Sequence, residues 1–133
     1  RPRCLLARVP LVEEHGVCSP VRICGERRAG LVPQTKHGSA LARLIASDPL
    51  LAPFTEVPAK EGGLDIEGIA ACGGRVALGL RGPVIATYAV LLEIAIKPKK
   101  SGKLALSGAP GKRLLALEGL GIRDLKRHGD DLL

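Results

Sequence analysis

The apolar positions in the second half of the chain follow the pattern of antiparallel strands. Residues 66–72 and 75–80 are two apolar runs separated by Gly73-Gly74, a dipeptide that supplies the positive φ angles of a two-residue hairpin. A longer apolar run covers residues 88–96, and a short one at residues 104–106 follows a basic turn. Because the longest run is too continuous for a half-exposed strand, we expect a sheet that is buried on both faces.

The first half has shorter runs and one helical pattern. Residues 4–9 and 20–24 predict two short strands, the first of them closed by Pro10. Ser39 can cap a helix over residues 39–46 whose apolar side chains share one face, and Asp48-Pro49 ends it. The stretch from residue 31 to residue 60 therefore predicts a helical insertion followed by an extended connector.

An internal repeat appears when the sequence is shifted by 56 residues. Four residues recur identically, and they are Gly63, Leu64, Ile66 and Gly73, matched by Gly119, Leu120, Ile122 and Gly129. The repeat predicts a strand over residues 122–127 and a turn at Gly129-Asp130, and residues 112–117 predict one more strand. A period near 50 residues with about four strands per unit is typical of β-propeller blades.

We therefore predict an all-β protein, a partial β-propeller of about two blades with one short helical insertion. Residues 1–30 would end a preceding blade and residues 31–60 would form the insertion and connector. Residues 61–110 would form one blade, and residues 111–133 would begin the next. The chain has no initiator Met and stops where a strand would begin, so we expect a piece of a longer protein.

Composition narrows the functional classes. Aromatic residues make up 2% of the chain and Met and Trp are absent, so the core must be built from Leu, Ile, Val and Ala. No apolar run approaches the roughly 18 to 20 residues of a membrane-spanning helix, which excludes that class. The four Cys form no C-x-x-C pair. They favour small buried hydrophobes in a reducing compartment such as the cytoplasm, with disulfides as the alternative.

The net charge of +7 is carried by scattered Arg and by a basic loop at residues 97–103. Such a loop could contact nucleic-acid phosphates or an anionic membrane surface. A solvated hairpin tip is the more common role, and the scarcity of aromatic residues removes the stacking platforms of single-strand binders. The composition therefore argues against a nucleic-acid partner.

Several strings carry a resemblance to a known family. "GLDIEGIA", "RVALGLRGPV", "AVLLEI" and "GLGIRDL" with "GDDLL" resemble, in that order and spacing, the bacterial domain of unknown function 3616 family, whose members look like β-propellers. The likeness covers residues 60–133 and extends back to residue 31. The family has no established activity, so the resemblance implies a fold and no reaction. Residues 65–70 are also similar to inner-strand motifs of phytase-like and lactonase-like propellers, in which an acidic residue can bind a divalent metal.

The candidate site follows from the place of an inner strand beside a propeller channel. Asp65 and Glu67 are separated by one residue and point the same way from a strand, as Ca²⁺ or Mg²⁺ coordination would require. The alternative is an ion pair of Glu67 with Arg81 or Arg123 that holds blades in register. Arg81, Arg123 and Asp124 are the candidate residues for binding a ligand.

Two functions remain open. The first is a scaffold that binds a small anionic molecule or a protein partner at its channel face. The second is a metal-dependent hydrolase of phosphate esters or lactones, with Asp65 and Glu67 as ligands and Arg81 or Arg123 steering the anion. A phosphate loop at residues 106–113 is excluded, because Leu106 replaces the required Gly and Arg113 replaces the Ser or Thr.

Overall fold

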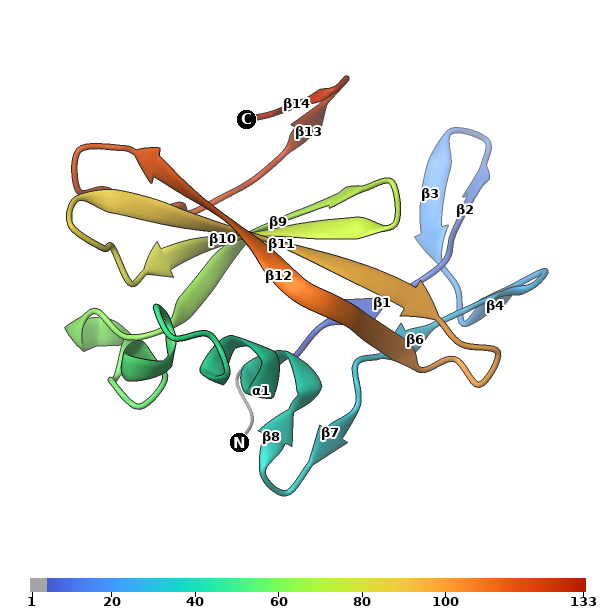
Figure 1. Ribbon diagram of the computed structural model, residues 1–133. Helices are drawn as coiled ribbons and strands as arrows, with labels where there is room; N and C mark the ends of the chain where they lie inside the picture. The colour runs from blue at the N-terminus through green and yellow to red at the C-terminus, as the bar shows by residue number, and fades with distance from the viewer. Residues whose placement is uncertain (1–4) are drawn as a thin grey trace.

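A four-stranded antiparallel sheet, in the order β12-β11-β10-β9, is the centre of the computed structural model, which describes residues 5–133 (Figure 1). Its strands are consecutive in the chain and are β9 Asp65–Cys72, β10 Arg75–Gly82, β11 Tyr88–Pro98 and β12 Leu104–Ala116. Cys72 lies opposite Arg75, so Gly73-Gly74 forms the predicted two-residue turn. An up-and-down sheet of four strands is the unit of a propeller blade. The predicted all-β fold is confirmed.

Small sheets and short helices surround this four-stranded sheet. Residues 5–133 contain five two-stranded antiparallel sheets, and none of them closes into a barrel. The pairs are β1 (Ala7–Arg8) with β6 (Gly30–Leu31), β2 (Leu11–Glu14) with β3 (Val17–Pro20), β4 (Ile23–Cys24) with β5 (Arg27–Arg28), β7 (Gln34–Thr35) with β8 (Gly38–Ser39), and β13 (Arg127–His128) with β14 (Asp131–Leu132). The helices are α1 (Ala40–Ala46) and the 3₁₀ turns η1 (Ala52–Phe54) and η2 (Ala59–Glu61). No helix among residues 5–133 is long and apolar enough to span a membrane.

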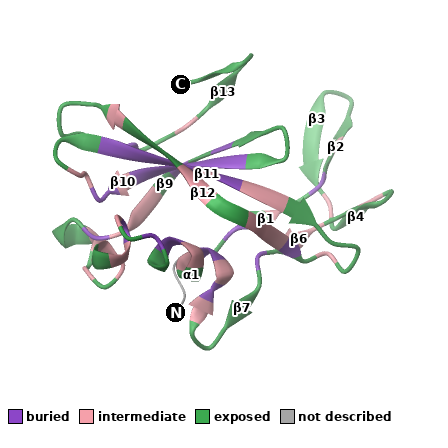
Figure 2. Cartoon of the chain, viewed as in Figure 1, coloured by how far each residue is buried: buried purple, intermediate pink, exposed green. Residues whose placement is uncertain are grey.

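The central strands β10 and β11 are buried on both faces of the sheet, as the continuous apolar runs predict. On one face, large side chains such as Val76, Leu78 and Leu80 of β10 pack with the side chains of α1. The opposite face carries the small residues Ala77 and Gly79, and the segment between β12 and β13 packs there. Figure 2 shows the buried residues concentrated along the middle of β10 and β11. Because Ala77 and Gly79 have small side chains or none, the C-terminal segment can approach this face of the sheet closely.

Helix α1 forms where the sequence predicts it. The Ser39 hydroxyl accepts a hydrogen bond from the Ala42 N–H at 3.0 Å, which satisfies one of the free donors of the first turn. Leu41 and Ile45 are buried against the sheet. The capped apolar face thus explains both the start of the helix and its position.

Asp48, just beyond α1, links the helix layer to the sheet. Its Oδ2 lies 2.5 Å from Lys112 Nζ on β12. Burial would raise the pKa of Asp48, but the hydrogen bond and charge of Lys112, with the N–H groups of Leu50 and Leu51, outweigh it and hold the pKa below its usual value. The paired carboxylate therefore favours the folded state when it is ionised.

Strand β12 differs from the prediction because it runs without a break from Leu104 to Ala116. Separate strands were expected at residues 104–106 and 112–117, and the expected boundary between residues 110 and 111 falls inside β12. Ser107 pairs with Ala95 and Gly111 with Glu93, so residues 108–110 bulge out opposite one residue of β11. An edge strand tolerates Pro in such a bulge, since one of its sides makes no ladder hydrogen bonds.

The predicted strand over residues 122–127 is wrong. Residues 117–126 form no strand, and β13 begins only at Arg127. The chain there follows the second face of the sheet, where Ile122 is buried, instead of pairing in a ladder. The predicted turn at Gly129-Asp130 is confirmed by the pairing of His128 with Asp131.

The N-terminal predictions are partly changed. The strand expected over residues 4–9 is reduced to β1, and its first residue lies outside the described residues. The strand expected over residues 20–24 is divided between the end of β3 and β4.

Cys18, Cys24 and Cys72 are free thiols, and the exposure of Cys18 and Cys72 contradicts the expected burial. Cys18 lies in a short exposed hairpin, and Cys72 lies at the end of β9 beside the exposed turn, so neither thiol is enclosed by the core.

Candidate functional site

Glu67 occupies a bulge in β9. Its neighbours Ile66 and Gly68 lie opposite Leu80 and Gly79, which are adjacent in β10, so Glu67 itself has no partner across the ladder. An extra residue of this kind bends the strand and redirects a side chain. The carboxylate of Glu67 is therefore placed by an irregularity of the sheet and not by simple alternation.

Arg81 occupies a second bulge, in the facing strand. Its neighbours Leu80 and Gly82 lie opposite Ile66 and Asp65, which are adjacent in β9. The two bulges are thus consecutive along the hairpin, one on each strand. They bring the unpaired residues Glu67 and Arg81 to the same point of the sheet.

Arg81 forms ion pairs with both candidate carboxylates. Its Nη2 lies 2.5 Å from Asp65 Oδ2, and its Nε lies 3.4 Å from Glu67 Oε1. All three side chains are partly buried, with exposed fractions of 24% to 33%. The predicted ion pair of Glu67 is present, and Arg81 is its partner.

This arrangement does not suit a divalent cation. The Arg81 guanidinium bridges the two carboxylates that would have to bind the metal, and its charge would repel a cation placed there. Among residues 5–133, no group of three or more His, Cys, Asp or Glu side chains is arranged to hold a metal ion. Calcium usually takes six or more oxygen ligands, and the two carboxylates provide too few. The donor set fits an ion pair better than a calcium or magnesium site.

An open pocket of about 890 Å³ adjoins Arg81. Three segments line it, and they are the η1–η2 connector with Phe54 and residues 59–62, the end of β10 with residues 81, 82 and 84, and residues 119–121 with Arg123. Arg81 and Arg123, two of the three candidate ligand-binding residues, both line this pocket. Asp124 does not line it, and its Oδ1 accepts a hydrogen bond from the Leu125 N–H at 2.8 Å.

Lys60 and Glu61 also line the pocket, and no sequence motif indicates this position. They belong to a connector rich in Pro and Gly that carries no ligand motif. Gly63, at the end of this connector, lies so close to Val57 that a Cβ on it would be 1.9 Å from the Val57 oxygen. This tight fold directs η2 toward the end of β10.

Close backbone contacts position Arg123. The Ile122 N–H donates a hydrogen bond to the Leu80 carbonyl at 2.9 Å. A Cβ on Gly121 would lie 2.0 Å from the Arg81 carbonyl oxygen, so only Gly fits there. The Ile122 side chain lies on Gly79, where a Cβ would be 2.3 Å from Ile122 Cγ2. The pocket wall that carries Arg123 is thus attached to β10 through the two residues that precede Arg123.

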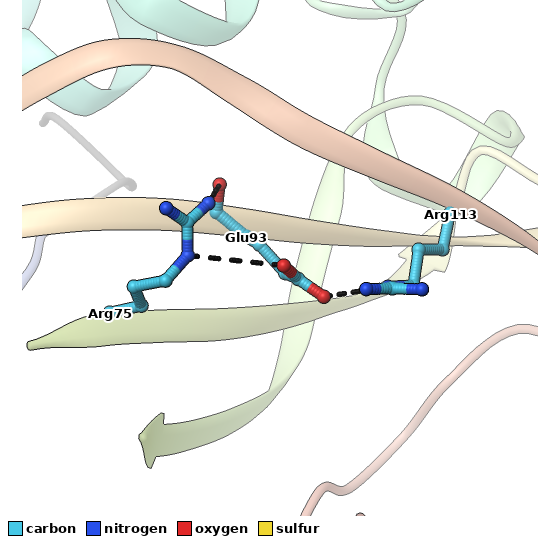
Figure 3. Close-up of polar contacts among 3 residues, drawn as sticks. All are labelled: Arg75, Glu93 and Arg113. Atoms are coloured by element: carbon cyan, nitrogen blue, oxygen red, sulfur yellow. Dashed lines mark hydrogen bonds and ion pairs between the residues drawn. The ribbon is translucent and has the colours of Figure 1, made fainter. Parts of the chain in front are cut away.

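A second ionic cluster lies farther along the sheet, on three neighbouring strands (Figure 3). Arg113 Nε donates to Glu93 Oε1 at 2.7 Å, and Arg75 Nε lies 3.9 Å from Glu93 Oε2. The hydrogen bond and charge of Glu93 raise the pKa of Arg113. No part of this cluster was predicted, because residues that meet across three strands are far apart in sequence.

Comparison with known families decides the classification. The family model described as "Protein of unknown function (DUF3616)" matches residues 1–133, the whole chain. The chain belongs to this family. The match confirms the resemblance carried by residues 60–133, and it also includes residues 1–30, to which that resemblance did not extend. Comparisons of this DUF3616 chain with curated proteins and with solved structures gave no match.

Proposed function

We propose that this DUF3616 protein is a propeller scaffold that binds a small anion in the pocket beside Arg81. One observation supports the proposal. Cationic side chains from three separate segments, Lys60, Arg81 and Arg123, line the same pocket. Neither Lys60 nor Arg123 takes part in the ion pairs found among residues 5–133, and Glu61 is the single carboxylate among the residues that line the pocket.

The three cations would have different roles. Arg81 is held by Asp65 and Glu67, so its guanidinium is oriented before a ligand arrives and its own charge is largely balanced. Arg123 is exposed and supplies a planar donor group that suits a carboxylate or phosphate. Lys60 adds a point charge across the pocket. The ligand class is therefore a compact carboxylate or phosphate, and the pocket volume is in the range of small-molecule sites.

Calorimetric titration of the protein with inorganic phosphate and, separately, with citrate tests the proposal. We expect saturable binding of at least one of the two, weakened about tenfold or more by Arg123→Gln, because a charge-assisted pair is lost. Lys126→Gln is the matched control, since it removes the same charge from the same segment outside the pocket. Equal binding by the two variants, or no binding of either anion, would contradict the proposal.

A further inference from the structure

A second cationic site lies at the other end of the sheet. We call it the basic cleft, and it is an open pocket of about 500 Å³ lined by Arg8, Glu26, Arg27, Arg28, Pro98, Lys99 and Lys100. Its walls come from β1, the β4–β5 hairpin and the loop between β11 and β12. Figure 1 shows this loop beside β4 and β6. The basic loop predicted as a solvated hairpin tip thus contributes to a site with Arg side chains from the N-terminal region.

A close contact between two glycines holds the β11–β12 loop against the N-terminal part of the basic cleft. A Cβ on Gly30 would lie 1.6 Å from the Gly102 carbonyl oxygen, which no other residue could accommodate without moving the loop. Gly102 has a φ of +83° and donates its N–H to the Lys99 carbonyl at 2.9 Å, which closes the turn. The position of Lys99 and Lys100 relative to Arg28 is therefore fixed by the backbone.

The charge of the basic cleft is largely unbalanced. Five cationic side chains share it with the single carboxylate of Glu26, and none of the ion pairs among residues 5–133 involves any of these six residues. Like charges held this close repel one another in the empty site, and a bound anion relieves that repulsion. The fold therefore maintains an arrangement that favours anions.

Arg8, which lines the cleft, has one hydrogen-bond donor without a partner among residues 5–133. Its Nη2 donates to the Arg28 carbonyl at 2.9 Å, which orients the guanidinium. Its Nε is buried and has no hydrogen-bond partner within the part of the chain that the structure describes. A buried donor without a partner costs free energy, so the fold keeps the Arg8 guanidinium beside the cleft at the expense of stability.

We propose that the basic cleft binds a small molecule that carries two or more linked phosphates. Five cations exceed what a single phosphate could contact, whereas a diphosphate presents several oxygens over a short distance. The volume suits a small molecule. No aromatic side chain lines the basic cleft, so it lacks the stacking platform that would favour a single-stranded nucleic acid.

Titration with inorganic pyrophosphate tests this site separately from the pocket beside Arg81. We expect saturable binding that weakens at least tenfold in the double variant Arg28→Gln with Lys100→Gln and falls as salt rises. Lys99→Gln with Lys100→Gln changes only the exposed loop and should also weaken binding, so a folding defect near β5 cannot explain the loss. Arg123→Gln should leave pyrophosphate affinity within twofold, whatever its effect on phosphate or citrate.

Three results would overturn the inference. These are the absence of saturable pyrophosphate binding, binding that the two cleft variants do not change, and a loss caused equally by the control Lys126→Gln. A single-stranded oligonucleotide gives a further test. If it bound more tightly than pyrophosphate and lost affinity in the same cleft variants, the basic cleft would be part of a nucleic-acid surface and the small-ligand proposal would be wrong.

Discussion

Substituting Gly79 by Ala tests how the C-terminal segment is attached to the sheet. Gly79 lies in β10 with an ordinary φ, so Ala brings no backbone strain of its own. The added Cβ would lie 2.3 Å from Ile122 Cγ2 and 2.9 Å from Ile122 Cβ. Backbone and a β-branched side chain cannot both keep their places at such distances, so Ile122 must move away.

The contact between residue 79 and Ile122 indicates how far Gly79→Ala should lower the free energy of unfolding. Overpacking a well-filled contact destabilises a protein by about 1–3 kcal/mol. Because the added Cβ clashes with two atoms of Ile122, Cβ and Cγ2, we expect a cost in the upper half of that range. Ile122 is only 7% exposed, so Ile122→Ala alone should cost about 2 kcal/mol or more. In the Ile122→Ala background the clash with Cγ2 disappears and only the 2.9 Å contact with the Cβ of residue 122 remains, so Gly79→Ala should then cost about 1 kcal/mol less.

Urea unfolding followed by far-ultraviolet circular dichroism measures these differences, since the chain has no Trp for fluorescence. Gly111→Ala is the matched control, because its Cβ would meet nothing closer than 3.5 Å and its φ is also ordinary. It should change the free energy of unfolding by less than about 0.5 kcal/mol. Strict additivity of Gly79→Ala and Ile122→Ala would refute the contact, as would equal effects of Gly79→Ala and Gly111→Ala.

Two further predictions concern ion pairs. Asp48→Asn should lower the free energy of unfolding by about 1.5–3 kcal/mol at pH 7, because Lys112 loses a charged acceptor. The pKa of Asp48 is depressed on folding, so its contribution is complete above the unfolded value of about 3.9 and is lost as the pH falls through the lower folded value. Urea titrations from pH 7 to pH 3 should therefore show the two proteins converging, and a constant difference would contradict this. Glu93→Gln should cost only about 0–1 kcal/mol, because Arg113 is two-thirds exposed, and a larger loss in the same assay would mean that the cluster is better shielded from water.

The elements that could be predicted are those whose signals are local. The hairpin at Gly73-Gly74 follows from turn chemistry, and the start of α1 follows from the capping side chain of Ser39. The failures occur where tertiary contacts overrule local patterns. Residues 108–110 have the composition of a turn, yet β12 absorbs them as an edge bulge. Ile122 has neighbours in sequence that are typical of a strand, but it is buried by packing over Gly68 and Gly79 instead of pairing in a ladder.

The candidate site shows the same division. The spacing of Asp65 and Glu67 was enough to single out two carboxylates, and Arg81 was near enough along the chain to be named as a partner. Lys60 could not be found in this way, because it reaches the pocket through a connector without a motif. The basic cleft depends on a contact between segments about 70 residues apart, Gly30 and Gly102, and no local pattern indicates it.

The two bulges at Glu67 and Arg81 compensate each other. Cys72 lies opposite Arg75 and Asp65 lies opposite Gly82, so each strand has six residues between the two pairs. Deleting only one of the bulged residues would slip one strand past the other and turn side chains to the wrong face. Deleting both together would preserve the alignment on either side. Glu67 and Arg81 are therefore a matched pair of extra residues, and we expect related sheets to contain either both bulges or neither.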